Sequence, residues 1–120
     1  MITSIQLNHR TKMLYLHFDD GFEQQLSYEF LRCYSPSEQS NKANANKPPV
    51  SNKKQVVVRA VEPLGKHGFR LHFDDQHEAV YSAQLLSEYA HNRERLWQHY
   101  VHQLHAHGLS REALIEIKQV

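Results

Sequence analysis

Cysteine is almost missing from this sequence: Cys33 is the single one among 120 residues. One thiol excludes an internal disulfide framework and is typical of a reducing compartment. Long apolar runs are missing too, because the longest aliphatic run, Val56–Val58, is far shorter than a membrane span. Residues 1–10 contain no apolar segment of a signal peptide. We therefore expect a soluble cytoplasmic protein that does not bind a membrane.

No charge of one sign dominates either. Lysine and arginine number 14 and the acidic residues 13, which gives a net charge of +1. Four lysines make the stretch 35–54 basic, but arginine and aromatic residues are not interleaved with them. Nucleic-acid-binding surfaces combine a clustered basic face with such side chains. We therefore expect no nucleic-acid partner.

The pentapeptide LHFDD occurs twice, at Leu16–Asp20 and at Leu71–Asp75. Aligning the copies gives an offset of 55 residues, and the match continues beyond them. The further identical pairs are Glu23 with Glu78, Ser27 with Ser82, and Leu31 with Leu86. An identity that extends along a whole segment indicates a repeated structural unit rather than a short motif used twice.

Each copy predicts three strands followed by a helix. Alternating apolar residues indicate strands, and the Asp-Asp pair indicates a turn between the second and third. The predicted strands are Ile2–Leu7, Leu14–Phe18, Phe22–Ser27, Gln55–Glu62, Phe69–Phe73 and Glu78–Tyr81. Helical patterns cover 28–32, 83–90, 92–107 and 111–118, with Ser82 and Ser110 as N-caps.

These elements predict an α+β fold: a tandem β-β-β-α repeat with mostly antiparallel sheets, followed by C-terminal helices. The chain is long enough for one modest core. We therefore expect a single domain over 1–107, made of pseudo-repeats at 1–34 and 55–90. The stretch 35–54 is rich in Ser, Asn, Lys and Pro and predicts a flexible loop. Residues 108–120 form a predicted helical extension.

Each LHFDD copy contains His-x-Asp, which also begins the metal site of Fe(II)/2-oxoglutarate oxygenases. His17 and Asp19, like His72 and Asp74, share one face of a strand because side chains alternate. That site also needs a second histidine on a large barrel, and this chain is too short to build one. We therefore interpret the motif as structural: histidine alternates with core residues and the aspartates open a turn.

A second cluster of possible metal ligands lies near the C-terminus. His99, His102 and His105 follow one another along one helix face, where neighbouring imidazoles can share Zn²⁺ or Ni²⁺. No acidic or cysteine partner has matching spacing, so we interpret the face as solvated. It should retard the protein on a metal-chelate column without holding stoichiometric metal. Cys33 has no base beside it, and we interpret it as a structural thiol.

Several ordered motifs together resemble a known family. They are Phe-x-Asp-Gly at 18–21, Leu31–Ser37, Val61–Gly65, and Phe73–His77 followed by Tyr81-Ser82. Over about residues 3–107 they resemble the family named for the N-terminal domain of γ-butyrobetaine hydroxylase, a domain of unknown function when it stands alone. A similar domain is appended to some Mrp-type ATPases that carry iron–sulfur clusters.

The resemblance implies the zinc site of the hydroxylase domain, in which three cysteines and one histidine hold the ion. The matching positions here are Ser35, Ser37, Ser40 and His77. Serine hydroxyls are poor zinc ligands beside thiolates, so we expect the family zinc site to be absent. The oxygenase barrel is absent too, and we expect no oxygenase or other enzymatic activity.

Two hypotheses for function remain. The first is a non-enzymatic accessory or interaction domain with a protein partner, linked to metalloprotein or iron–sulfur maturation. Its contact surfaces would be the 35–54 loop and the rim around His77 and Tyr81, and it would need no cofactor. The alternative is a Zn- or Fe-binding protein that uses His77 with His72, His17 or Cys33, or a stand-alone relative of an oxygenase accessory domain.

Overall fold

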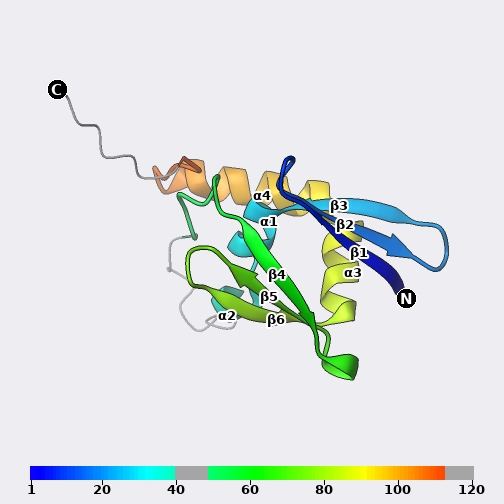
Figure 1. Cartoon of the computed structure of the whole chain (residues 1–120). Coiled ribbons are helices and arrows are strands. Elements are labelled where there is room, and N and C mark those ends of the chain that lie inside the picture. The colour runs from blue at the N-terminus through cyan, green and yellow to red at the C-terminus, as the bar shows by residue number, and fades with distance from the viewer. Residues whose placement is uncertain (40–48, 113–120) are drawn as a thin grey trace.

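The computed structural model describes residues 1–39 and 49–112. Its first half is an antiparallel sheet of β1 (Ile2–Asn8), β2 (Met13–Phe18) and β3 (Glu23–Ser27), in that order (Figure 1). Helix α1 (Tyr28–Cys33) follows β3 directly. Ser27 ends the strand and caps the helix, because its Oγ accepts a hydrogen bond from the Phe30 amide at 2.9 Å.

The second half repeats this plan. Strands β4 (Val58–Pro63), β5 (Phe69–Phe73) and β6 (Glu78–Tyr81) form a second antiparallel sheet, and α3 (Ala83–His91) follows β6. Ser82 caps α3 as Ser27 caps α1, with its Oγ 3.0 Å from the Leu85 amide. A short 3-10 turn, η1 (Gly65–His67), joins β4 to β5. The predicted α+β tandem of β-β-β-α units is confirmed.

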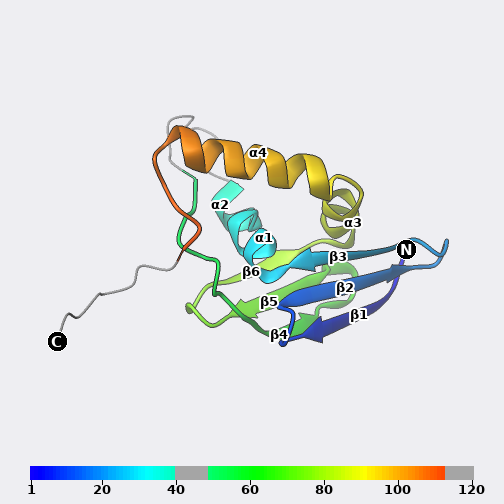
Figure 2. The ribbon, with the colours of Figure 1, turned by 90° about the horizontal axis from the view of Figure 1, so that it is seen from above.

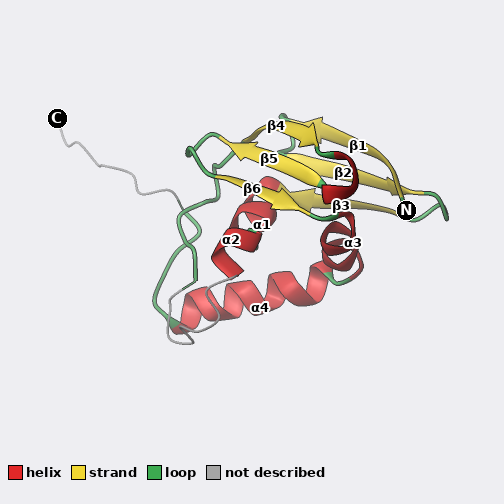
Figure 3. Cartoon of the chain, turned by 90° about the horizontal axis from the view of Figure 1, so that it is seen from below, coloured by secondary structure: helices red, strands yellow, loops and turns green. Residues whose placement is uncertain are grey.

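Two further helices complete the fold. Helix α2 (Pro36–Gln39) follows α1, and α4 (Arg93–Ala106) follows α3. The helices gather on the side of β3 and β6, whereas β1 and β4 lie farthest from them (Figures 2 and 3). Within the described parts of the chain, no helix has the length and apolar character needed to cross a bilayer.

The chain between the two units departs from a plain loop. It begins with α2. Near its end, the Asn52 amide donates to the Ser110 carbonyl and the Lys54 amide donates to the Arg111 carbonyl, at 2.9 Å each. Residues 40–48 lie outside the described residues, as does nearly all of the predicted helix 111–118. Strand β4 starts later than predicted, because the Val57 amide is taken by the Asp74 carboxylate at 3.0 Å.

Both units contribute to one hydrophobic core, as a single modest domain requires. Leu14 and Leu16 of β2 are fully buried, and so is Leu71 of β5, the repeat counterpart of Leu16. Leu86 of α3 is fully buried in the same cluster. A smaller cluster, of Cys33, Tyr100 and Leu104, packs α4 onto the end of α1. Each sheet therefore buries its apolar face against the other unit and the helices.

The first aspartate of each LHFDD copy ties the turn to the strand before it. The Asp19 amide donates to the Met1 carbonyl at 2.9 Å, and the Met1 amino group donates to the Asp19 carboxylate at 3.1 Å. Asp74 makes the same two contacts with Val57, at 2.9 and 3.0 Å. Both aspartates thus replace a regular strand pair at the end of the sheet, which is a structural role.

The second aspartate of each copy closes the turn itself. Asp20 Oδ1 accepts from the Phe22 amide at 3.0 Å, and Asp75 Oδ1 accepts from the His77 amide at 3.2 Å. The second aspartate of each copy therefore accepts the same turn hydrogen bond in both units. His77 is positioned by this turn, and it stands where the first unit has Phe22.

Candidate functional site

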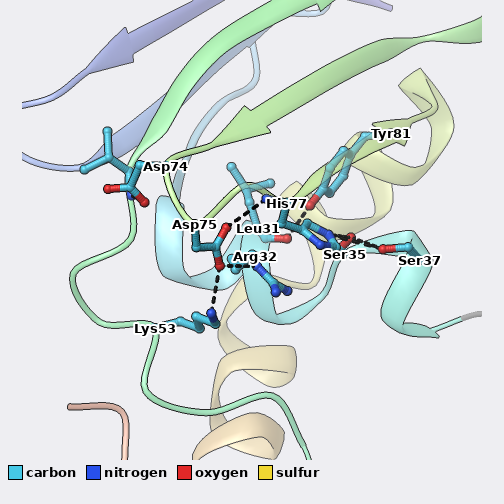
Figure 4. Close-up of polar contacts among 10 residues, drawn as sticks. Leu31, Arg32, Ser35, Ser37, Lys53, Asp74, Asp75, His77 and Tyr81 are labelled. Carbon is cyan, nitrogen blue, oxygen red and sulfur yellow. Dashed lines mark hydrogen bonds and ion pairs between the residues drawn. The ribbon is translucent and has the colours of Figure 1, made fainter. Parts of the chain in front are cut away.

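The candidate site lies where the second unit's hairpin turn meets the end of α1. His77 begins the return of the β5–β6 hairpin, and Ser35 and Ser37 flank Pro36 at the start of α2 (Figure 4). Helix α1 ends at Cys33, so the chain turns here and brings both serines toward the hairpin. Ser35 is fully buried, His77 is partly buried and Ser37 is exposed. The site is therefore a junction that opens to solvent on the Ser37 side.

Two hydroxyls and one imidazole converge at this junction. His77 Nε2 lies 2.7 Å from Ser35 Oγ and 3.2 Å from Ser37 Oγ, and the two hydroxyl oxygens are 3.0 Å apart. In the sequence, Ser35 lies 42 positions before His77 and Ser37 lies 40 positions before it. The structure thus brings together three of the positions that the resemblance assigns to zinc; Ser40 lies outside the described residues.

The donor set at this junction does not suit zinc. A structural zinc site uses thiolates and imidazoles, which carry or readily donate electron density to the ion. Here two neutral hydroxyls stand in the place of thiolates, and each is already engaged in a hydrogen bond with His77. No group of three or more His, Cys, Asp or Glu side chains in residues 1–39 and 49–112 could hold a metal ion.

Next to the cluster, Asp75 accepts hydrogen bonds from two cations. Arg32 Nε donates to Asp75 Oδ2 at 2.8 Å and Lys53 Nζ donates to the same oxygen at 2.7 Å (Figure 4). Burial alone would raise the pKa of Asp75, but these two hydrogen bonds and the positive charges outweigh it and lower the pKa to about 2. This ion triad joins α1, the 49–57 segment and the hairpin turn.

The Asp75 carboxylate should contribute a pH-dependent part of the stability. Because its folded pKa lies below the ordinary 3.8, the contribution is present above about pH 4 and is lost as the pH falls toward 2. We expect Asp75→Asn to lower the free energy of unfolding by about 1–2 kcal/mol at pH 7, since solvent screens part of the interaction. The difference from the unchanged protein should fall to about a few tenths of a kcal/mol near pH 2, where about half of the carboxylates are protonated. Urea unfolding between pH 2 and 7 measures both.

Asp20→Asn is the matched control, because Asp20 is the repeat counterpart of Asp75 and closes a turn of the same kind. It should cost less than half as much as Asp75→Asn, since an Asn oxygen still accepts the turn hydrogen bond. Equal costs for the two variants, or a cost for Asp75→Asn that is as large at pH 2 as at pH 7, would contradict the ion-triad interpretation.

Two buried tyrosines donate hydrogen bonds to the end of α1, next to the cluster. The Tyr81 hydroxyl donates to the Leu31 carbonyl, and the Tyr89 hydroxyl donates to the Tyr34 carbonyl at 2.6 Å. Burial raises the pKa of Tyr81, so its proton stays on the hydroxyl. Both tyrosines satisfy carbonyls at the end of α1 that no helical amide can reach. They therefore fix the end of α1, directly before Ser35.

The weaker metal-ligand candidates lie elsewhere. His17 Nδ1 is 3.2 Å from Glu23, and the two nitrogens of His72 are 3.3 Å from Glu62 and 3.2 Å from Glu78. The strand geometry therefore pairs these histidines with carboxylates on the same sheet face, not with His77. His99, His102 and His105 are exposed on α4, as the solvated-face interpretation expects.

Cys33 packs against Tyr100 and Leu104 of α4. Burial raises the pKa of the Cys33 thiol to about 12, and its exposed fraction is 5%. Less than about one thiol in a thousand is then ionised at pH 8, and the thiolate is the reactive form. We expect Ellman's reagent to label native Cys33 at least ~100-fold more slowly than the same protein in urea. Labelling of the native protein at the unfolded rate would contradict this.

The comparisons with known proteins now identify the family. The family described as gamma-butyrobetaine hydroxylase-like, N-terminal, matches residues 5–87, more than half of the chain. The chain belongs to this family. The match covers both β-β-β-α units as far as α3, and with it the junction at Ser35, Ser37 and His77. No curated protein is similar to the chain at a significant level.

Solved structures of similar proteins have the same fold. Two proteins whose structures were determined by NMR in solution are similar to this family member. The first has 30% identity and a TM-score of 0.79, covering 100% of this chain and 96% of its own. The second has 35% identity and a TM-score of 0.76, covering 99% and 90%. A crystal structure from Acidithiobacillus ferrooxidans, of a DUF971-family protein of unknown function, has 26% identity and a TM-score of 0.59, covering 71% and 86%.

Proposed function

We propose that this chain is a non-enzymatic accessory domain that acts by docking to a protein partner. The observation that supports it most is the Ser35–Ser37–His77 cluster. At the positions where the resemblance implies zinc ligands, the donors are hydroxyls and an imidazole joined in mutual hydrogen bonds. Such a cluster stiffens a junction of three segments, and a stiff, partly exposed junction favours recognition over chemistry.

The docking surface in this proposal is the rim of the junction. Ser37 is exposed there, and the Lys53 and Asp75 side chains are 25% and 23% exposed beside it. Charged rims of this kind contribute to partner choice and association rate. The resemblance to domains appended to iron–sulfur ATPases points to partners in metalloprotein or iron–sulfur maturation, which is the finer part of the proposal.

The proposal is tested by affinity purification of the full chain from its native cells, with quantitative mass spectrometry. We expect reproducible recovery of a small set of partners. Ser37→Arg, which places a bulky cation on the rim, should reduce their recovery at least about tenfold. Gln98→Arg adds the same group to an exposed position of α4 and is the matched control. Recovery of no partner by the unchanged chain, or equal recovery by both variants, would sink the proposal.

A second candidate function is binding of Zn or Fe at the junction through His77. The resemblance is what motivates it, since His77 matches the zinc-binding histidine that the resemblance implies. Incomplete ligand sets bind weakly, because each missing thiolate removes a large part of the binding free energy. Elemental analysis of untagged protein tests this candidate: one retained equivalent of Zn or Fe would favour it over docking alone.

A further inference from the structure

The last described residues are joined to the body of the domain by an ion pair with a buried carboxylate. Arg111 Nε and Nη2 donate to the two oxygens of Glu29 at 2.9 Å each. Glu29, on α1, has only 6% of its side chain exposed, whereas that of Arg111 is 39% exposed. The cation that neutralises this buried carboxylate thus comes from the surface and lies on a segment outside any helix or strand.

An aromatic ring completes the recognition of the guanidinium. The Arg111 Cζ atom lies 4.9 Å from the centroid of the Trp97 ring on α4. A carboxylate that accepts two parallel hydrogen bonds, together with an aromatic face, fits the planar guanidinium and does not fit an ammonium equally well. Glu29 and Trp97, which we call the arginine pocket, therefore select arginine.

The arginine pocket has room for more than one side chain. A cavity of about 270 Å³ lies against Glu29, Trp97 and Arg111. Met13 and Phe30 supply apolar wall, and Arg93 and Glu94 supply charge of both signs. Groups that neighbour a bound arginine can therefore also be accommodated.

The chain around Arg111 is recognised through its backbone. Asn52 and Lys54 amides donate to the Ser110 and Arg111 carbonyls at 2.9 Å each, and Asn52 Nδ2 donates to the Glu112 carbonyl at 2.6 Å. Main-chain contacts of this kind accept any sequence. Lys54 Nζ, 2.9 Å from Glu112 Oε1, adds a preference for an acidic residue after the arginine.

We infer that the arginine pocket and the Asn52–Lys54 backbone form a docking site for an Arg-acidic segment of a partner protein, and that Ser110–Glu112 occupies it in cis. This inference rests on the proposed function, since it names the chemistry of the partner. The chain's own segment shows which chemistry fits. It is joined to α4 through Gly108, at φ +65°, and holds no place in the sheets or the core clusters. Its departure removes no residue from the sheets or the core clusters, and an incoming arginine would neutralise Glu29 in its place.

The cis segment competes with an added peptide for the pocket, so it determines how much more weakly the peptide binds the unchanged chain. A ligand on a short tether has an effective concentration in the millimolar range. A peptide that binds the empty pocket with a dissociation constant near 0.1 mM would then bind the occupied one about tenfold more weakly. Arg111→Gln empties the pocket and keeps the tether.

The test uses the full chain and the heptapeptide AHGLSRE, the sequence of residues 106–112. Trp97 is the only tryptophan in the sequence, so its indole N–H signal in NMR reports binding at the pocket. We expect the Arg111→Gln chain to bind AHGLSRE about tenfold more tightly than the unchanged chain. The lysine peptide AHGLSKE should bind about tenfold more weakly than AHGLSRE. Adding Glu29→Gln to Arg111→Gln should remove most of the binding, whereas adding Glu94→Gln should not.

The inference is overturned if Arg111→Gln does not increase the affinity, or if the arginine and lysine peptides bind equally. It is also overturned if the Glu29→Gln, Arg111→Gln chain binds as well as Arg111→Gln alone. If that double variant does not fold, the comparison of the two peptides on the folded Arg111→Gln chain still decides. Partners recovered from cells together with no peptide binding would leave the proposed function standing and reject this site alone.

Discussion

Replacing Ser35, Ser37 and Ser40 together by cysteine is expected to give this chain a tight zinc site. The structure already places Ser35 and Ser37 within 3.2 Å of His77 Nε2. The resemblance implies that cysteines at these three positions complete the ligand set with the histidine. Three thiolates and an imidazole bind zinc with apparent free energies of about 10–16 kcal/mol at neutral pH. The variant should therefore retain one zinc per chain through gel filtration, and zinc should raise its melting temperature.

The control for the zinc variant is the same triple substitution with His77→Ala. Loss of one ligand should weaken zinc binding at least ~100-fold, measured by competition with a chromophoric chelator. The unchanged chain should retain no zinc under the same conditions, because its hydroxyls are poor ligands. A triple-cysteine variant that folds but keeps less than half an equivalent of zinc would refute the prediction.

Gly68→Ala is expected to destabilise the fold strongly. Gly68 has φ +106°, and a Cβ atom there would lie 2.3 Å from the Tyr81 carbonyl oxygen and 2.8 Å from Ser82 Cα. These are backbone atoms of the neighbouring strand and of the α3 cap, so they cannot move aside without disturbing the sheet. We expect a loss of about 3 kcal/mol or more in the free energy of unfolding. That is a large part of the stability of a domain of this size.

Gly65→Ala is the matched control for Gly68→Ala. Gly65 also has a positive φ, +60°, but a Cβ atom there meets nothing within 4 Å. It should cost only about 1 kcal/mol, the usual cost of a non-glycine residue in the left-handed region. Chemical denaturation compares the two variants. Equal losses in the free energy of unfolding for both variants would show that the close approach at Gly68 is not the cause of its cost.

The secondary structure was predictable because the same strand, turn and helix-cap signals occur in both repeat units. The alternation around Leu16 predicts β2, and the same alternation around Leu71 predicts β5. Ser27 and Ser82 mark helix starts at equivalent positions, and both cap their helices. Local signals of this kind depend on residues that are close in sequence, so one sequence is enough to read them.

The candidate site was only partly predictable. The resemblance pointed to His77, Ser35 and Ser37, and the structure brings all three together. It did not point to the ion triad: Arg32 and Asp75 lie in two of the motifs that carry the resemblance, but they are 43 residues apart and nothing in either motif pairs them. The pairing of Glu29 with Arg111 spans 82 residues and was missed for the same reason. A charged residue next to an apolar run gives no sign of its distant partner.

By itself, the sequence determined the six strands and the helices that follow each unit, together with the structural role of LHFDD, but it did not indicate α2. Side-chain periodicity, turn residues and helix caps act over a few residues, so they can be read without the fold. Only the tertiary structure decided which polar groups meet: the hydroxyls of Ser35 and Ser37 with His77, and Arg111 with Glu29. Such contacts form because the two sheets and the helices share one core, and the packing of that core brings residues distant in sequence together.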